Sequence, residues 1–386
     1  MNLQTTWKHY NARLLTAAEI EPRLVAAWTE LEGRALHPNA FLSPHFVLPA
    51  LKYLEPAQEC FGVFIERQAA GSRDLVGVAW LRIRKPTHRF PLPHLAAFLS
   101  IHSYLSDFLL DQECAADALQ AIYCALRRAG QGWHGLYINN ASVESLYDEA
   151  LQATARENRL RWHLVEEWQR AILYPTQAEM ALSEYISKRR LKNYQKSWKK
   201  LEEQGRLEWA LHWSEANNIE TGIEAFLRME HSGWKKEEGT SLLSHPHEAG
   251  FFREMMQGFG KAGRAYFTEI RLNDRVIAST ANMISGRVGV GFKIGWEDEY
   301  TGYGLGIANE IKLIEHAGQF SRLAFIDSCA APDSYMNELW PGRRKICEGW
   351  FSLTPIGEAA LQAAQFARKL KAGLQNASRG KESHKT

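Results

Sequence analysis

The spacing of apolar residues in the first half of the chain predicts strands that alternate with helices. Over 115–129, small and aliphatic residues recur at every third or fourth position, as on the buried face of a helix. Shorter apolar runs typical of strands cover 60–66, 75–84 and 135–139. Alternating elements of this kind predict an α/β layer structure.

The second half of the chain opens with a different pattern. A helix is predicted over 181–204, ended by Gly205, with an apolar stripe formed by Leu191, Tyr194, Trp198 and Leu201. An antiparallel meander follows, because the turn pairs Asn273-Asp274 and Ser285-Gly286 separate strand-like runs at 266–272, 275–284 and 288–296. A glycine-rich loop, a helix over 307–316 and a strand over 323–326 complete the pattern.

The length of 386 residues predicts two domains, since one domain usually takes about 150 residues. Pro175 and the polar residues after it form the joint, so we expect domains at 1–175 and 176–375. The small polar residues of 376–386 are typical of a frayed tail. No close sequence repeat links the halves, and a diverged structural duplication stays open.

Composition and charge exclude several classes of protein. Hydrophobic residues make up 45% of the chain and charged residues 23%, which excludes disorder over most of its length. A net charge of +2 excludes a surface that follows a polyanion throughout. The N-terminus lacks the pattern of a secretory signal, and polar residues interrupt the apolar stretch 92–110, so we expect a cytoplasmic protein without a membrane span.

The glycine-rich loop Thr301-Gly302-Tyr303-Gly304-Leu305-Gly306 carries the functional argument. Its glycines allow positive φ and let main-chain N–H groups approach a ligand, and the helix that follows presents its positive end. A flexible turn is the alternative on spacing alone. The preceding meander favours a binding loop.

Here the chain resembles the GNAT acyltransferases, whose pyrophosphate loop opens a helix after an antiparallel meander. Nearly the whole chain resembles the FemAB-related, double-GNAT group, which includes acetyltransferase-like proteins of bacterial cellulose and exopolysaccharide clusters. Landmarks of that group are similar to Gly295-Trp296-Glu297-Asp298-Glu299-Tyr300, Gly304-Leu305-Gly306, Lys188-Arg189-Arg190, Gly233-Trp234-Lys235 and Asp327 ahead of Tyr335.

The resemblance implies two tandem GNAT-like α/β domains, each a mixed, mostly antiparallel sheet flanked by helices. It also implies an acyl-CoA donor, acetyl-CoA for example, and an amine acceptor, without a metal. The residues expected to bind the donor are Gly302, Tyr303, Gly304, Leu305, Gly306, Ile294 and Lys293.

Acyl transfer to an amine needs a base, an acid for the leaving thiolate and donors to the oxyanion. Tyr335 resembles the GNAT tyrosine that faces the thiol sulfur, with a packing role as the alternative. Main-chain N–H groups near 292–295 are expected to polarise the thioester. Asp298, Glu297 and Glu269 are candidate bases, or solvated and paired acids, whereas Asp327 either stabilises substrate or caps a turn.

Two further patterns suggest other chemistry. The five scattered cysteines indicate reduced thiols, and the His245-Pro246-His247 segment lacks a third metal ligand. The acid-free run Lys188, Arg189, Arg190, Lys192, Lys196, Lys199 and Lys200 is either a solvated helix face or an anion site for CoA, a nucleotide-linked substrate or tRNA. A Fem-like transferase that uses aminoacyl-tRNA and a catalytically silent accessory protein therefore remain alternatives, and the sequence predicts neither the acceptor nor an oligomeric state.

Overall fold

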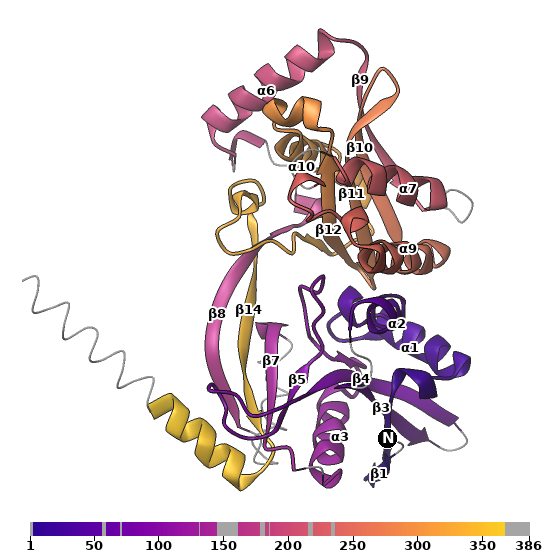
Figure 1. Ribbon diagram of the computed structural model, residues 1–386, viewed down its shortest axis with the longest axis vertical. Coiled ribbons are helices and arrows are strands. Elements are labelled where there is room, and N and C mark those ends of the chain that lie inside the picture. Colours follow the sequence, from indigo (N-terminus) through magenta and orange to yellow (C-terminus); the bar gives the residue numbers. More distant parts are fainter. Residues whose placement is uncertain are drawn as a thin grey trace, which may run out of the picture.

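One continuous β-sheet runs through the protein and carries helices on both faces (Figure 1). The structure is a computed structural model that describes residues 3–55, 59–69, 72–130, 132–144, 161–177, 182–184, 186–214, 219–232 and 236–366. The strand order is β1-β2-β3-β4-β5-β7-β14-β8-β13-β12-β11-β10-β9, with β6 paired to β4. The Gly233-Trp234-Lys235 landmark and the tail 376–386 lie outside the described residues.

The first half contributes the strands at one end of the sheet. Its strands are β1 (Leu3–Trp7), β2 (Tyr10–Leu15), β3 (Cys60–Ala69), β4 (Ser72–Arg84), β5 (His94–Ala97), β6 (Leu109–Leu110), β7 (Gly135–Ser142) and β8 (Trp162–Leu173). Its helices are α1 (Pro22–Arg34), α2 (Pro44–Tyr53) and α3 (Ala115–Arg128).

The second half contributes the strands at the other end. Its strands are β9 (Leu207–Trp213), β10 (Ala265–Leu272), β11 (Arg275–Ser285), β12 (Val288–Trp296), β13 (Phe325–Asp327) and β14 (Gly342–Ser352). Its helices are α6 (Lys188–Glu202), α7 (Ile219–Glu230), α9 (Pro246–Lys261) and α10 (Leu305–Glu315), and a further helix covers 355–366.

The two halves repeat the same order of elements. The first repeat, residues 10–142, runs β2, α1, α2, β3, β4, β5, α3, β7; the second repeat, residues 207–327, runs β9, α7, α9, β10, β11, β12, α10, β13. In both repeats the last two strands pair in parallel and all earlier neighbours pair antiparallel. The prediction of two mixed, mostly antiparallel domains flanked by helices is therefore confirmed, and the duplication is visible in topology.

Two strands are exchanged between the repeats. β8 follows the first repeat in sequence but pairs with β13 of the second, whereas β14 follows the second repeat and pairs with β7 of the first. β8 and β14 also pair with each other over most of their length, and Figure 1 shows them side by side as long strands that join the two halves. The boundary between residues 175 and 176 stays a prediction.

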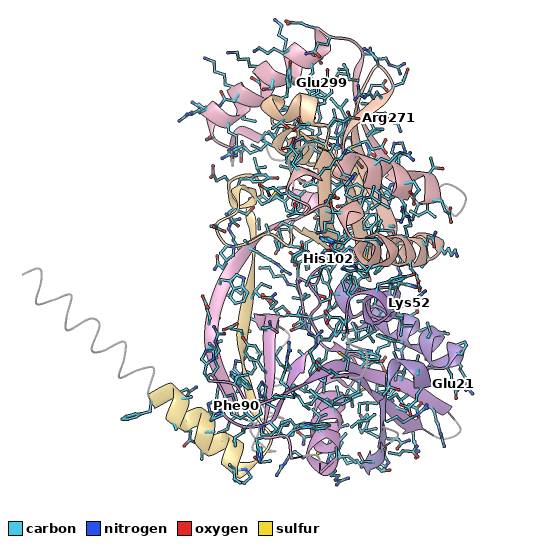
Figure 2. The ribbon with its side chains drawn as sticks, in the orientation of Figure 1. Glu21, Lys52, Phe90, His102, Arg271 and Glu299 are labelled. Atoms are coloured by element: carbon cyan, nitrogen blue, oxygen red, sulfur yellow. The ribbon has the colours of Figure 1, made fainter. Side chains whose placement is uncertain are left out.

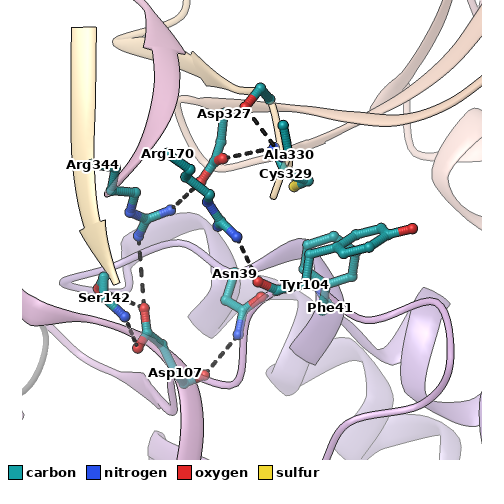
Figure 3. Close-up of polar contacts among 11 residues, drawn as sticks. Asn39, Phe41, Tyr104, Asp107, Ser142, Arg170, Asp327, Cys329, Ala330 and Arg344 are labelled. Atoms are coloured by element: carbon teal, nitrogen blue, oxygen red, sulfur yellow. Dashed lines mark hydrogen bonds and ion pairs between the residues drawn. The ribbon is translucent and has the colours of Figure 1, made fainter. Parts of the chain in front are cut away.

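A buried ion-pair cluster lies where the exchanged strands meet (Figure 3). Arg170 of β8 and Arg344 of β14 bind Asp327 of β13 at 2.7 and 2.8 Å, and Arg344 also lies 3.7 Å from Asp107. Asp107 accepts hydrogen bonds from the main-chain N–H and the hydroxyl of Ser142 in β7. Each charge is thus offset by an opposite one, as burial requires.

One hydrophobic core is shared by helices of both repeats. α1 and α2 of the first repeat pack with α7 and α9 of the second, and the ring centroids of Phe46 and Phe251 lie 5.2 Å apart. His102 lies at this junction in Figure 2, where its Nε2 is 2.8 Å from Oε2 of Glu248 in α9. α3 and α10 cover the opposite face of the sheet in their own repeats.

The predicted elements agree with the structure, with shifted ends. The meander strands and both turn pairs are present, and Asn273 and Asp274 have the positive φ values, 51° and 65°, of a tight hairpin turn. The predicted start of the helix over 181–204 is wrong. α6 begins at Lys188, because the Ser187 side chain accepts a hydrogen bond from the N–H of Arg190 and caps the helix there.

Candidate functional site

β12 and β13 separate to form a cleft in the sheet of the second repeat. They pair in parallel only from Val288 to Val290, so the remainder of β12 has lost its neighbour on that side. The register with β11 also shifts at this point, since Ala281 faces Lys293 and Asn282 faces Gly291, which leaves Phe292 as an extra residue. Such a bulge bends a strand and redirects its main-chain groups.

The glycine-rich loop lies at the N-terminus of α10, as predicted. A short 3-10 helix covers Asp298–Tyr303, and Gly304 then takes φ +67° and becomes the N-cap of α10. The helix begins at Leu305, two residues before the predicted start. Gly304 has no side chain to cap the first turn, so main-chain N–H groups of that turn remain available to a ligand.

A cavity of about 570 Å³ lies between this loop and α6. We call it the loop cavity; its lining residues from α6 and its cap are Ser187, Arg189, Arg190, Asn193, Tyr194 and Ser197. Gly302, Tyr303, Gly304 and Ile307 line the opposite wall, and Arg190 forms an ion pair with Glu338 across one end. Two arginines and a helix N-terminus therefore converge on one concave surface, which favours an anionic ligand.

A second cavity, of about 200 Å³, fills the space between β12 and β13. We call it the cleft cavity; β12 contributes Gly291, Phe292, Lys293 and Ile294 to its wall. α10 contributes Glu310 and Leu313, and the segment after β13 contributes Tyr335, Met336 and Trp340. Glu310 is the only acid among the described residues that line it.

Gly306 lies between the two cavities. A Cβ atom placed on it would lie 3.4 Å from the Tyr335 hydroxyl oxygen and 3.5 Å from Cδ1 of Ile294. The first turn of α10 therefore has the loop cavity on one side and the cleft cavity on the other. One extended ligand could reach from the arginines of α6 to the bulge of β12.

Tyr335 is 38% exposed and its hydroxyl group faces this junction. Burial and, secondly, the nearby Glu310 raise its pKa above the ordinary value, so the hydroxyl group carries its proton at neutral pH. Burial also raises the pKa of Glu310 to about 8. A proton donor and a titratable carboxyl group thus lie in one cavity.

The acids singled out from the sequence lie elsewhere. Glu269 lies on the opposite face of the sheet, in a separate cavity of about 440 Å³ beside α7. Burial raises its pKa, but hydrogen bonds from His212 and Arg271 outweigh this and lower it. Glu297 pairs with Arg275, and Asp298 accepts a hydrogen bond from Thr301, its neighbour in the 3-10 helix.

Asp327 belongs to the ion-pair cluster of Figure 3 and does not line the cleft cavity. One carboxylate oxygen contacts Arg170 and Arg344, and the other accepts the N–H of Cys329 at 2.9 Å. Although burial raises the pKa of Asp327, the two arginines lower it below the ordinary value. These contacts match the turn-capping alternative for Asp327.

Sequence reasoning missed Glu310 and the polar network beneath it. Asn309 is fully buried, accepts a hydrogen bond from Trp209 and donates one to Thr268, which in turn bonds Thr280. The signal was present, because Asn309 and Glu310 interrupt the apolar pattern of a short helix. Only the position of Glu310 one turn after Gly306 would have directed attention to it.

The basic run on α6 divides between two faces. Arg189 and Arg190 line the loop cavity, whereas Lys188, Lys192, Lys196, Lys199 and Lys200 are exposed and do not line it. Within the described part of the chain, none of these lysines forms an ion pair. The apolar stripe packs on α10, where Lys312 lies over the Trp198 ring.

Two structural observations concern the alternatives of metal binding and membrane insertion. Within the described ranges, no three histidine, cysteine, aspartate or glutamate side chains come together as metal ligands would. No helix of the described residues combines the length and apolar character needed to cross a membrane.

Comparison with known proteins agrees with this geometry. Residues 187–335, which contain the loop, both cavities and α6, match a family described as an acetyltransferase (GNAT) domain. No curated protein sequence matches the chain. The second repeat, with the α6 segment before it, therefore contains a GNAT acetyltransferase domain.

Solved structures show the same fold over most of the chain. The structure of FemX has a TM-score of 0.55 and 10% identity, with 88% of this chain and 98% of that chain covered. The C-terminal domain of a candidate lysylphosphatidylglycerol synthetase from Agrobacterium fabrum has a TM-score of 0.51 and 12% identity, with 90% and 96% covered. At these identities the similarity concerns the fold, and it includes both repeats.

Proposed function

We propose that the second repeat transfers an acyl group from acyl-CoA to an amine, by direct attack of the amine on the thioester. The observation that carries the proposal is the pair of cavities on either side of the first turn of α10. One is lined by arginines and an uncapped helix N-terminus, and the other by the bulged strand and a protonated tyrosine. CoA has a matching layout, with phosphates at one end and a thioester at the other.

The phosphates of CoA bind in the loop cavity. Main-chain N–H groups of the α10 first turn donate to the pyrophosphate, and Arg189 and Arg190 offset its charge. The pantetheine arm then passes Gly306, where a side chain would narrow the path beside Tyr335. Gly302, Tyr303, Gly304 and Leu305 thus keep the roles that the sequence suggested.

The thioester lies in the cleft cavity against β12. Main-chain N–H groups of 291–295 have no pairing with β13, so they can donate to the carbonyl oxygen as negative charge develops on it. Lys293 and Ile294 belong to this strand segment. The neutral amine attacks the carbonyl carbon, and the C–S bond breaks as the tetrahedral intermediate collapses.

Glu310 and Tyr335 handle the protons. Glu310 is the acid that lines the cleft cavity, and we assign it the proton that the amine loses in forming the amide. Tyr335 donates its proton to the sulfur of the leaving CoA. The products are an amide and CoA, and Tyr335 recovers its proton from solvent. Glu297, Asp298 and Glu269 lie outside the cavity lining and are not needed for this scheme.

An aminoacyl-tRNA donor is the second candidate, in keeping with the FemAB-related sequence pattern. The observation that favours it is the exposed lysine row on α6, turned away from the loop cavity and without acidic partners among the described residues. An RNA backbone would bind such a row with strong salt dependence. The silent accessory protein, in contrast, would bind neither donor, and a cytoplasmic location remains part of each proposal.

Two matched variants test the donor. Arg189→Gln with Arg190→Gln changes the loop cavity, and Lys188→Gln with Lys192→Gln and Lys196→Gln changes only the exposed row. We expect CoA to bind the wild-type chain and the lysine variant alike in titration calorimetry, and the arginine variant much more weakly. At 100 times its dissociation constant, CoA should add about 2.7 kcal/mol to stability.

The opposite result would replace the donor. A wild-type chain that ignores CoA, but binds tRNA with a slope of log K against log salt that falls by ~0.7–0.9 per lost phosphate contact in the lysine variant, would support the tRNA-dependent reaction. Binding of neither donor would support the accessory protein.

A further inference from the structure

The closed end of the cleft cavity contains two buried hydrogen-bond donors without acceptors. Tyr266 of β10 and Trp340 after β13 both line this cavity and are 0% and 2% exposed. Among the described residues, neither the Tyr266 hydroxyl group nor Nε1 of Trp340 has a hydrogen-bond partner. Buried polar groups in native proteins are nearly always paired, so an unpaired set inside a cavity points to a ligand.

The position of these donors is set by the sheet. A Cβ atom on Gly289 would lie 3.4 Å from the Tyr266 hydroxyl oxygen, and Gly289 pairs with Ile326 where β12 and β13 meet. Tyr266, Ile326 and Trp340 belong to one hydrophobic cluster. The two donors therefore lie at the end of the cavity opposite to its opening, in otherwise apolar surroundings that include Leu313 and Met336.

Nearby acceptors are already in use. The hydroxyl groups of Thr268 and Thr280 bond each other at 2.6 Å, and Asn282 donates to Thr280 at 2.7 Å and to the Tyr266 carbonyl oxygen. Glu310 lies close enough to raise the pKa of Tyr266, but it forms no hydrogen bond with it. The fold thus provides polar partners beside these donors and leaves the donors themselves for something else.

We propose that the transferred acyl group carries an uncharged oxygen, a hydroxyl or carbonyl group, that accepts hydrogen bonds from Tyr266 and Trp340 at the closed end of the cleft cavity. The inference rests on the proposed function, since it assumes that an acyl thioester occupies the cavity. It assigns the substrate class as hydroxyacyl or oxoacyl CoA esters rather than plain alkyl ones.

The chemistry of the donors excludes the charged alternatives. An ammonium group has no lone pair to accept from the indole N–H. A carboxylate would meet the Glu310 carboxyl group in the same cavity, whereas the nearest lining cation, Lys293, acts on His102 at the junction between the repeats. An alkyl end would leave both donors buried and unpaired.

Three CoA esters with four-carbon acyl groups test the inference on the full chain. Butyryl-CoA, 3-hydroxybutyryl-CoA and acetoacetyl-CoA differ only in the oxygen, and their dissociation constants are measured by titration calorimetry without an acceptor amine. We expect the oxygenated esters to bind at least tenfold more tightly, because a site built to hydrogen-bond a group rejects the analogue that lacks it. Equal affinities, or tighter binding of butyryl-CoA, would overturn the inference.

Variants at the two donors separate recognition from folding. Tyr266→Phe and Trp340→Phe each remove one donor, so the preference for the oxygenated esters should shrink in each and disappear in the double variant, while affinity for unacylated CoA stays the same. Since Tyr266→Phe removes an unpaired buried hydroxyl group, its melting temperature without ligand should not fall. A preference that survives in the folded double variant would contradict the assignment.

Failure of the proposed function gives a different result. If neither CoA nor any ester binds the wild-type chain, the acyl-CoA reaction is wrong and this inference falls with it. If all three esters and CoA bind alike, only the inference about the acyl group is wrong.

Discussion

Tyr335 and Glu310 are the two acidic groups that line the cleft cavity, and burial raises the pKa of both. At neutral pH both therefore tend to keep their protons, although ordinary glutamates are ionised there. Such perturbed groups gather at functional sites, where a proton donor and a proton acceptor must work at the same pH. Their individual effects can be separated by conservative substitutions.

Tyr335→Phe should lower the turnover rate on the true substrate by ~10²–10⁴, the usual contribution of a general acid. Affinity for CoA should change little, because the ring and its packing are retained. Initial rates and calorimetric titrations measure the two quantities. Tyr53→Phe, on α2 in the first repeat, is the matched control and should behave as wild type. Full turnover by the folded Tyr335→Phe variant would remove Tyr335 from the mechanism.

Glu310 makes stability depend on pH. Because burial raises its pKa from 4.5 to about 8, the unfolded chain loses this proton first as pH rises, and the native state becomes less stable between pH 4.5 and 8. Glu310→Gln should remove this loss. The variant should gain on the wild type between pH 5 and 9 by a few kcal/mol, at about 1.4 kcal/mol for each pKa unit.

Urea unfolding at pH 5 and pH 9 measures this change, with Glu254→Gln on exposed α9 surface as the control. The same stability difference between variant and wild type at both pH values would show that Glu310 titrates normally. If Glu310 is also the base, the rate of acyl transfer should rise with pH through about 8 and should lose this dependence in Glu310→Gln.

At the scale of elements, the join between the glycine-rich loop and α10 depends on one backbone conformation. Gly304 has φ +67°, whereas Gly302 lies at ordinary φ, and a Cβ atom on either would contact nothing within 4 Å. The two positions thus differ in backbone strain and not in space. This makes them a matched pair for testing the helix N-terminus.

Gly304→Ala should weaken CoA binding roughly tenfold, because a left-handed conformation costs an L-residue about 1–2 kcal/mol. The strain should shift the loop and the first-turn N–H groups away from the phosphates. Gly302→Ala should bind CoA as the wild type does. Titration calorimetry on both folded variants measures the effect, and equal affinity for both would place the phosphates elsewhere.

At the scale of the whole molecule, exchanged strands and shared helices join the repeats. β8 and β14 each pair with strands of both halves, and the core between α2 and α9 contains aromatic rings from both repeats. The ion-pair cluster of Asp327, Arg170, Arg344 and Asp107 lies where these strands meet. Neither repeat has a complete set of partners without the other.

We therefore expect the repeats to unfold in one cooperative transition. Calorimetry should show one heat-absorption peak, with equal calorimetric and van't Hoff enthalpies. Two resolved transitions would mean that the strand exchange does not couple the repeats.

Asp327→Ala should destabilise the whole chain by about 3–5 kcal/mol, because it leaves the buried Arg170 and Arg344 without their main counter-charge. Breaking the exposed Lys52–Glu254 pair by Glu254→Gln should cost about 0–1 kcal/mol. Denaturant unfolding compares the two. A small loss in Asp327→Ala would indicate that Asp327 contributes little to the join and would return it to consideration as a substrate-binding residue.

The sequence by itself determined the local elements of the second repeat and the position of its binding loop. Alternation and turn pairs such as Asn273-Asp274 specify a meander through short-range geometry, and the glycines before a helical pattern specify an open helix N-terminus. Arg189 and Arg190 were identified as part of a basic run, but the lysines beside them look the same in sequence, and only the direction of each side chain from α6 separates the two faces.

Tertiary structure decided the rest, because long-range pairing leaves little trace in local pattern. The exchange of β8 and β14 depends on strands far apart in the chain, and the burial of Glu310, Tyr266 and Trp340 depends on where α10 lies across β12 and β13. Burial raises the pKa of Glu310 and leaves the donors of Tyr266 and Trp340 unpaired. Residue type supplies the chemical group, and the surrounding fold sets its charge state and its partner.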